Sequence, residues 1–378
     1  MFFGNPQEDS TLTLFLVAKS MYSLSTRISD DRQINLIPEV AFSPDGSMFA
    51  VTHHGSQKVV VFDSSTRAVL RTYQNPGSRL DGPHGILITD NHIVISNTHR
   101  LTRPSSFSIY RLSDSSDQPV SVFETPYDSL REAHSLAIHN GILVATYSEN
   151  TDINGAIVAY RFDDDAGLIT ATLDILRLPF ETFGEPKGVA FTGDGSSIYF
   201  TYVTQKPMTG WSELARRLRA ARKEWARTSV SEFARYVGSN LRKKKNGRQR
   251  TPPEFKNGIV VFGMNEMGKF SKLPIRTMER DSFCRLENIS FIGDTVVMSD
   301  TINGAIYFHD LLEDPDLKTP THTVTEELTL PHGVKLSPDK AMLVVTNYGL
   351  KHKNQVIHWG VMDTPNNSGI LVYDLQAK

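Results

Sequence analysis

Six copies of a short phrase each place an ionisable side chain at their third position. These third residues are, in chain order, Glu39, His84, His134, Lys187, Glu287 and His332. Neutral imidazoles bind zinc, iron, copper and nickel, and three of them with one carboxylate leave room for water or substrate, as catalytic metal sites require. The pattern predicts a divalent transition metal, zinc or iron rather than calcium. Its predicted ligands are His84, His134, His332 and Glu39.

Lys187 and Glu287 carry opposite charges in consecutive copies. They are the candidate catalytic residues, as an acid/base pair opposite the metal. A plain salt bridge between them is an alternative. Another alternative covers all six positions, because polar side chains that line a water-filled channel can simply hydrogen-bond one another and the backbone.

The remainder of each copy predicts four short β-strands. In the first copy these are residues 39–43, 48–53, 58–62 and 68–73, and the turn sequence Ser43-Pro44-Asp45-Gly46 separates the first two. The copies begin near residues 36, 81, 131, 184, 285 and 329, a period of about 45 to 50 residues once one long insertion is set aside, which is typical of propeller blades. We predict an all-β, six-bladed β-propeller over residues 1–378, with seven blades as the alternative.

The sixth copy ends after its third strand at the C-terminus. The N-terminal stretch from Thr11 to Ile28 contains strand-like sequence that belongs to no other copy. We expect it to supply the outer strand of the last blade, because closing the ring protects the edges that an open array would expose.

This architecture predicts where the six positions lie. First strands line the central channel, and their starts lie at the same face as the ends of the antiparallel second strands. The six ionisable residues should therefore ring the channel mouth. Asn97, Asp300 and Asn347 at the ends of second strands, and the long loop 348–368, should join them there.

The Pro-His-Gly phrases and the Ser-Pro-Asp-Gly-like turns resemble the NHL and SMP-30/gluconolactonase-like superfamily of six-bladed propellers. In gluconolactonase-like members this repeat position includes Glu, Asn and Asp ligands of a divalent cation. Similar phrases in peptidyl-amidoglycolate lyases and streptogramin lyases carry His. The resemblance thus implies that Glu39, His84, His134 and His332 occupy ligand positions. Lys187 departs from the pattern, and no copy carries the gluconolactonase Asn.

A basic insertion interrupts the fourth copy between its second and third strands, over residues 206–254. Residues 206–250 hold fourteen Lys and Arg against Glu213, Glu224 and Glu232, a net +11, so the remainder of the chain carries about −13 of the total −2. Apolar residues at helical spacing, including Trp211 and Trp225, predict two amphipathic helices followed by a basic loop. The insertion could be a lid, an anionic-membrane contact or a site for an acidic protein partner. Nucleic acid is the weakest reading, because no recognised binding motif accompanies the charge.

Composition indicates an ordinary globular protein of 378 residues with one cysteine, Cys284. A single cysteine excludes an internal disulfide and suits a reducing compartment. The apolar segment from Thr11 to Ala18 follows acidic residues and is too short for a membrane span. We expect a cytoplasmic protein.

Two functions fit these features. The first is a metal-dependent enzyme, a hydrolase, lyase or oxidative enzyme, that acts on a small or peptide-derived molecule at the channel mouth. The second is a non-catalytic scaffold that binds a partner protein or an anionic membrane through the insertion.

Overall fold

The structure is a computed structural model. It describes residues 22–28, 37–74, 79–99, 103–127, 130–149, 155–178, 183–205, 255–280, 283–328, 330–347 and 369–375. All named elements of these residues are β-strands, and they form six four-stranded antiparallel sheets. The fold is therefore an all-β propeller of six blades, as predicted.

In blades 1 to 5 the strands follow chain order from the channel outward, and in blade 6 the outermost strand is β1. Blade 1 comprises β2 (Val40–Phe42), β3 (Met48–His53), β4 (Lys58–Asp63) and β5 (Val69–Gln74), and blade 2 comprises β6 (Pro83–Ile88), β7 (His92–Asn97), β8 (Ser106–Arg111) and β9 (Ser121–Glu124). Blade 3 comprises β10 (Arg131–His139), β11 (Ile142–Glu149), β12 (Ala156–Asp163) and β13 (Leu168–Arg177), and blade 4 comprises β14 (Glu185–Phe191), β15 (Ser197–Gln205), β16 (Phe255–Gly263) and β17 (Arg276–Glu279). Blade 5 comprises β18 (Leu286–Ile292), β19 (Thr295–Asp300), β20 (Ala305–Asp310) and β21 (His322–Val324), and blade 6 comprises β22 (Pro331–Leu336), β23 (Met342–Asn347), β24 (Gly369–Leu375) and β1 (Tyr22–Ile28).

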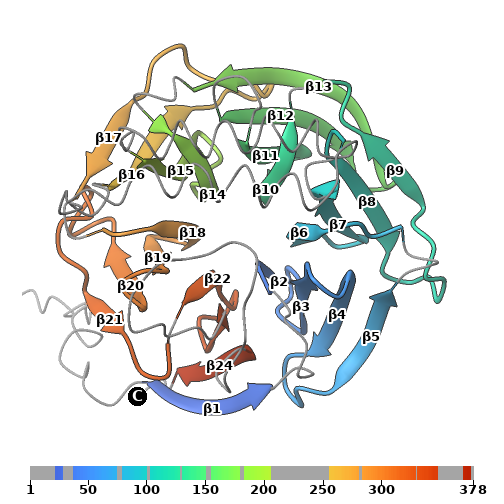
Figure 1. Cartoon of the computed structure of the whole chain (residues 1–378), viewed down its shortest axis with the longest axis horizontal. Helices are drawn as coiled ribbons and strands as arrows, with labels where there is room; N and C mark the ends of the chain where they lie inside the picture. Colours follow the sequence, from blue (N-terminus) through green and yellow to red (C-terminus); the bar gives the residue numbers. More distant parts are fainter. Residues whose placement is uncertain are drawn as a thin grey trace, which may run out of the picture. The chain divides into compact units, whose positions relative to one another are not determined.

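The last blade is closed by the N-terminal strand. β1 pairs antiparallel with β24, with Tyr22 opposite Leu375 and Ile28 opposite Ile370. The innermost strands contact one another in the cyclic order β2, β6, β10, β14, β18, β22 and back to β2 (Figure 1). The ring is therefore closed both at its inner strands and through an outer strand from the opposite end of the chain, as the sequence predicted.

Apolar side chains fill the space between neighbouring sheets. One buried cluster joins Phe107 of blade 2 to Tyr160 of blade 3, and another joins Phe49 of blade 1 to Val344 of blade 6. Because both faces of a blade meet a neighbour, the inner strands are apolar on both faces, and β7 is buried along its whole length. This packing explains why the sequence shows apolar runs rather than strict alternation.

A β-bulge lies at the recurring ionisable position in five blades. In β6 the pairing with β7 steps from Pro83 to Ile86 while β7 advances by only two residues, which inserts one extra residue at His84-Gly85. Corresponding shifts occur in β10, β14, β18 and β22. A bulge re-aims a side chain and leaves a backbone N–H without its ladder partner.

A buried hydroxyl on the second strand, opposite the bulge, accepts a hydrogen bond from this unpaired N–H. Thr146 Oγ1 accepts from Ser135 N at 3.1 Å and donates to the carbonyl oxygen of Lys187, in the next blade, at 2.6 Å. Ser96 in the same way links Gly85 N (2.8 Å) to the carbonyl of Ala133 (2.8 Å). One side chain thus satisfies the bulge and ties its blade to the neighbouring inner strand.

The inner strands approach closely enough to require glycine at two bulges. A Cβ on Gly333 would lie 2.7 Å from the carbonyl oxygen of Pro38, and one on Gly188 would lie 2.6 Å from the Cα atom of Asn288. Both neighbours are backbone atoms of the next blade, which cannot move aside cheaply. At these two positions the glycine after the ionisable residue is therefore a packing requirement.

The basic insertion belongs to a separate unit. The chain divides into residues 1–204 with 257–378, and residues 205–256. Residues 206–254 lie outside the described part of the chain, so the two predicted helices and the basic loop remain predictions. Among the residues that are described, no helix has the length and apolar character that a membrane span requires.

Removing the hydroxyl that bridges blades 3 and 4 should weaken the fold. Thr146→Val is nearly isosteric but leaves a buried N–H and a buried carbonyl without their partner, which typically costs about 1–3 kcal/mol. We expect a lower free energy of unfolding in urea, whereas Thr323→Val at an exposed position of β21 should change it little. Equal stability of the two variants would contradict this role of Thr146.

Candidate metal centre

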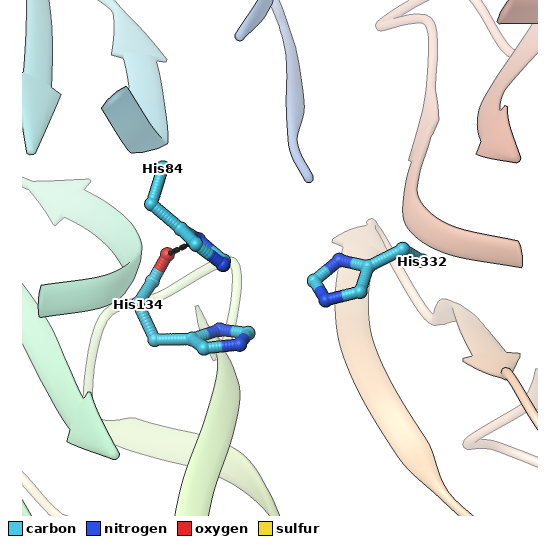
Figure 2. Close-up of side chains that lie close together, drawn as sticks. All are labelled: His84, His134 and His332. Carbon is cyan, nitrogen blue, oxygen red and sulfur yellow. Dashed lines mark hydrogen bonds between the residues drawn. The ribbon is translucent and has the colours of Figure 1, made fainter. Parts of the chain in front are cut away.

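Three of the six recurring side chains meet in the channel. One ring nitrogen from each of His84, His134 and His332 lies within 4.8 Å of the other two, and all three residues are buried. The ring centroids of His84 and His134 are 4.0 Å apart, and that of His332 lies 5.3 Å from His134. Figure 2 shows the rings from three different blades pointing into one space. The structure thus brings together the three histidines of the predicted metal site.

Backbone carbonyls orient two of these rings. The Nδ1 atom of His84 lies 2.8 Å from the carbonyl oxygen of His134, the bond drawn in Figure 2, and Nδ1 of His332 lies 2.7 Å from that of Pro38. A carbonyl oxygen only accepts, so Nδ1 carries the proton in both rings and Nε2 of the neutral imidazole carries a lone pair. This is the tautomer that presents Nε2 as a metal ligand.

Burial keeps the three imidazoles neutral. Loss of solvation is the main cause that lowers the pKa of His84 and of His134 well below the ordinary value, and the neighbouring imidazoles add to it. The pKa of His332 falls to about 4, again mainly through burial, although the Glu287 carboxylate opposes the shift. Neutral rings are the form that binds a metal, so no proton needs to be displaced near pH 7.

Glu287 borders this cluster. Its Oε2 atom lies 3.5 Å from Nε2 of His134 and 3.5 Å from Nε2 of His332. Its Oε1 atom accepts a hydrogen bond from Nε of Arg285. Burial opposes ionisation of Glu287, but Arg285 and Lys187 outweigh it and hold the pKa of the carboxyl well below its usual range. Glu287 is therefore a carboxylate beside two of the three histidines.

Lys187 forms its ion pair within its own blade. Its Nζ atom lies 3.2 Å from Oε2 of Glu185, two residues earlier on β14. Burial lowers the pKa of Lys187, but the carboxylates of Glu185 and Glu287 more than compensate, so the net shift is upward. The side chain is therefore an ammonium group near neutral pH and is better suited to stabilise negative charge than to accept a proton.

Glu39 lies apart from the histidine group. Its Oε1 atom accepts a hydrogen bond of 2.5 Å from Nδ2 of Asn288, and Asn288 is buried with its Oδ1 atom unpartnered. Burial raises the pKa of Glu39 to about 7, although Lys335 and hydrogen bonds from Ser135 and Asn288 oppose the shift. The group of ligand atoms within 4.8 Å of one another contains the three histidines and not Glu39. Its role as a ligand stays a prediction.

Three polar residues expected at this face bind the backbone of the segments that lead into first strands. Asn97 Oδ1 accepts from Asp81 N at 3.0 Å, Asn347 Oδ1 accepts from Leu330 N at 2.9 Å, and Asp300 accepts from the backbone N–H groups of Cys284 and Arg285. Each bond fixes the segment that leads into a first strand. The loop 348–368 lies outside the described residues.

The sequence reading missed two kinds of residue that shape the site. Arg285 was not singled out, although it anchors Glu287 and stands only two residues before it. The second-strand hydroxyls were also missed, yet they recur at one position in every copy. They are Thr52, Ser96, Thr146, Thr201, Ser299 and Thr346, and all six are buried. A recurring Ser or Thr after an apolar run was the available signal.

Comparison with known proteins shows the fold and leaves the family open. No protein-family model matches the chain, and no curated protein matches it. Among solved structures, a luciferin-regenerating enzyme matches with a TM-score of 0.54 at 11% sequence identity, over 91% of this chain and 91% of that one. Hydrazine synthase of Kuenenia stuttgartiensis matches with a TM-score of 0.49 at 15% identity, over 86% of this chain and 96% of that one. At these identities the likeness is one of fold, so membership of the NHL or SMP-30-like superfamily stays a prediction.

The depressed histidine pKa predicts acid sensitivity of the metal-free protein. A histidine with a folded pKa near 4 and an unfolded pKa near 6.5 contributes stability that is fully present above pH 6.5 and is lost as the pH falls toward 4. His332→Asn retains a donor for the Pro38 carbonyl and removes the titrating ring. Urea unfolding between pH 7 and pH 4 should therefore show a smaller loss of stability in this variant than in the wild type. The same loss in both proteins would contradict the assignment of a buried neutral ring.

Proposed function

We propose that the protein is a metal-dependent enzyme that acts on a small or peptide-derived molecule in the central channel, by hydrolytic, lyase or oxidative chemistry. The observation that carries this proposal is the convergence of three buried histidines whose ligand atoms lie within 4.8 Å of one another. Three neutral imidazoles gathered in one buried space are a donor set that suits a divalent transition metal.

The residues present fit a transition metal. The Nε2 atoms of His84 and His332 are fixed as acceptors by the carbonyls that hold Nδ1, and Nδ1 of His134 has no hydrogen-bond partner. Imidazole donors suit zinc and iron and are poor ligands for calcium. When bound, such an ion would polarise a substrate carbonyl or lower the pKa of a coordinated water.

Charged side chains beside the histidines support electrostatic roles for the proposed catalytic pair. The raised pKa of Lys187 and the lowered pKa of Glu287 keep both groups ionised near neutral pH. Lys187 would therefore stabilise negative charge that develops on a substrate, and Glu287 would offset the charge of the metal. Both groups stand on inner strands of adjacent blades, which are rigid supports for a site.

The scaffold function is favoured by one specific feature, the net charge of +11 in residues 206–250. A basic segment of this kind attracts anionic lipid headgroups, an acidic protein or an anionic substrate. In this second proposal the insertion binds an anionic membrane, and the channel histidines serve only the fold.

The metal proposal predicts that protein purified without chelator retains about one transition-metal ion per chain. His84→Asn and His332→Asn keep a side-chain donor for the backbone carbonyl and delete the ligand atom, so both should lose most of the metal while remaining folded. His322→Asn, on the outer strand β21, is the matched control and should keep it. Elemental analysis measures all four proteins. A wild type that neither retains nor takes up a transition metal would contradict the proposal.

The scaffold proposal predicts binding to vesicles that contain anionic lipid. Replacing Lys243, Lys244 and Lys245 with Glu should reduce flotation with anionic vesicles and leave metal content unchanged. Binding should also fall with salt, because exposed charges are screened within about 8 Å at physiological ionic strength. Wild-type protein that does not float with anionic vesicles at low salt would contradict membrane binding.

A further inference from the structure

Three polar side chains of blade 2 form a chain of hydrogen bonds at the end of the blade where β7 stops and β8 starts. Nδ1 of His99 lies 3.0 Å from Oδ2 of Asp81, and Nε2 of the same ring lies 2.8 Å from Oγ of Ser106. Asp81 precedes β6, His99 follows β7, and Ser106 is the first residue of β8. A carboxylate, an imidazole and a serine linked in this order have the geometry of a nucleophilic triad, which does not depend on their order in the chain.

The direction of each hydrogen bond in this network is fixed. A carboxylate only accepts, so Nδ1 of His99 donates to Asp81 and Nε2 of the neutral ring is an acceptor. The Ser106 hydroxyl therefore donates to Nε2. Asn97 supports this direction, because its Oδ1 accepts from the Asp81 N–H and its Nδ2 donates to the Ser106 oxygen at 3.3 Å. The serine proton thus points at the nitrogen that can take it.

The other blades do without this network. Ser106 begins the third strand of its blade, and the residue that begins the third strand is Ala156 in blade 3, Ala305 in blade 5 and Gly369 in blade 6. A hydroxyl at this place is therefore no requirement of the propeller fold.

The backbone of His99 also departs from ordinary geometry. Its φ of 48° lies in the left-handed region, which is uncommon for a residue with a side chain. The His99 N–H donates to the Asp81 carbonyl oxygen at 3.0 Å, so Asp81 holds both the backbone and the ring of this histidine. Unfavourable backbone conformations that are held in this way are concentrated at functional sites.

We propose that Ser106 is a nucleophile toward small carboxylic esters, with His99 as its general base and Asp81 as the positioning residue of the imidazole. Oγ of Ser106 forms a bond to the acyl carbon, and its proton passes to Nε2 of His99. The bond from the acyl carbon to the alcohol oxygen then breaks, and the departing alcohol takes this proton. Water next gives a proton to His99 and attacks the acyl carbon, which releases the carboxylic acid, and the proton returns to Ser106.

Burial sets the size of the substrate and the protonation of the base. Ser106 and His99 are each 3% exposed, whereas the Asp81 side chain is 37% exposed, so only a short acyl group can reach the serine. Burial is the main cause that lowers the pKa of His99. The hydrogen bond and the charge of Asp81 and the charge of Glu124 oppose this shift, and Arg103 adds to it. His99 is therefore neutral near pH 7, the form that accepts a proton.

Methanesulfonyl fluoride is a suitable probe, because it is small and sulfonylates an activated serine with loss of fluoride. We expect the wild type to take up about one sulfonyl group, at Ser106 in a peptide map by mass spectrometry, and to hydrolyse p-nitrophenyl acetate faster than esters of longer acids. Ser106→Ala and His99→Asn should lower both rates about 100-fold or more, as expected for loss of a nucleophile or its base. Asn tolerates the left-handed backbone at this position.

Ser108→Ala is the matched control. Ser108 is buried on the same strand and also accepts a hydrogen bond from Asn97 Nδ2, at 2.9 Å, but its printed partners do not include His99. This variant should react like the wild type. Removal of metal by a chelator should also leave sulfonylation unchanged, because the triad shares no residue with the candidate metal centre.

Asp81→Asn tests the positioning role through the pH dependence. The rate of sulfonylation should rise with pH through the pKa of His99, because only the neutral ring accepts the proton. Removing the carboxylate removes an interaction that raises this pKa, so the midpoint should move to lower pH and the maximal rate should fall. An unchanged midpoint would overturn the positioning role of Asp81.

The peptide map of the wild type decides the proposal even where a buried substitution prevents folding. Folded wild type that takes up no sulfonyl group, or takes it up at a residue other than Ser106, overturns the nucleophile. Sulfonylation that is lost together with the metal, or that persists unchanged in a folded Ser106→Ala variant, overturns it equally.

Discussion

The buried hydroxyl opposite each bulge is the interaction on which the inner ring depends. A bulge turns the ionisable side chain into the channel but leaves a backbone N–H without its ladder partner. The hydroxyl oxygen of a Thr or Ser on the second strand accepts a hydrogen bond from this N–H. In blades 1, 2, 3 and 5 this hydroxyl also donates a hydrogen bond to an inner-strand carbonyl of the next blade. The donors are Thr52, Ser96, Thr146 and Ser299. The orientation of the site and the cohesion of the blades therefore share one hydrogen-bond device.

The candidate metal centre uses the same seams. Nδ1 of His84 bonds the inner strand of blade 3, and Nδ1 of His332 bonds Pro38 where blade 6 meets blade 1. Thr346 Oγ1 also lies 3.3 Å from the Pro38 carbonyl oxygen, so this one acceptor joins blade 6 to blade 1 and orients the imidazole of His332. Each of these rings is held by a rigid neighbour on one side and presents its other nitrogen to the channel. Such preorganisation is what a metal site needs from its surroundings.

Charge balance separates the ionisable positions into distinct roles. Glu287 and Lys187 stand on adjacent blades, but each has its closest ion-pair partner two residues earlier in its own chain segment. Glu287 pairs with Arg285, just before β18, and Lys187 pairs with Glu185 on β14. Glu39 turns to Asn288 and stays outside the histidine group. The fold shared with the luciferin-regenerating enzyme tolerates many such arrangements, so function here has to be argued from these side chains and not from the propeller itself.

The sequence by itself determined the six blades, the closing strand and the convergence of His84, His134 and His332. Strand repeats have a fixed period, and equivalent positions of a closed ring must face one axis. It could not determine how the six positions divide into ligands, ion pairs and supports. The residues on either side of Glu287 in the chain determine two of these contacts. Asn288 donates a hydrogen bond to Glu39, and Arg285 pairs with Glu287. The register of the bulge in β18 decides which side chain each of them contacts. Those choices depend on distances of a few ångströms between different blades, which only the packed tertiary structure sets.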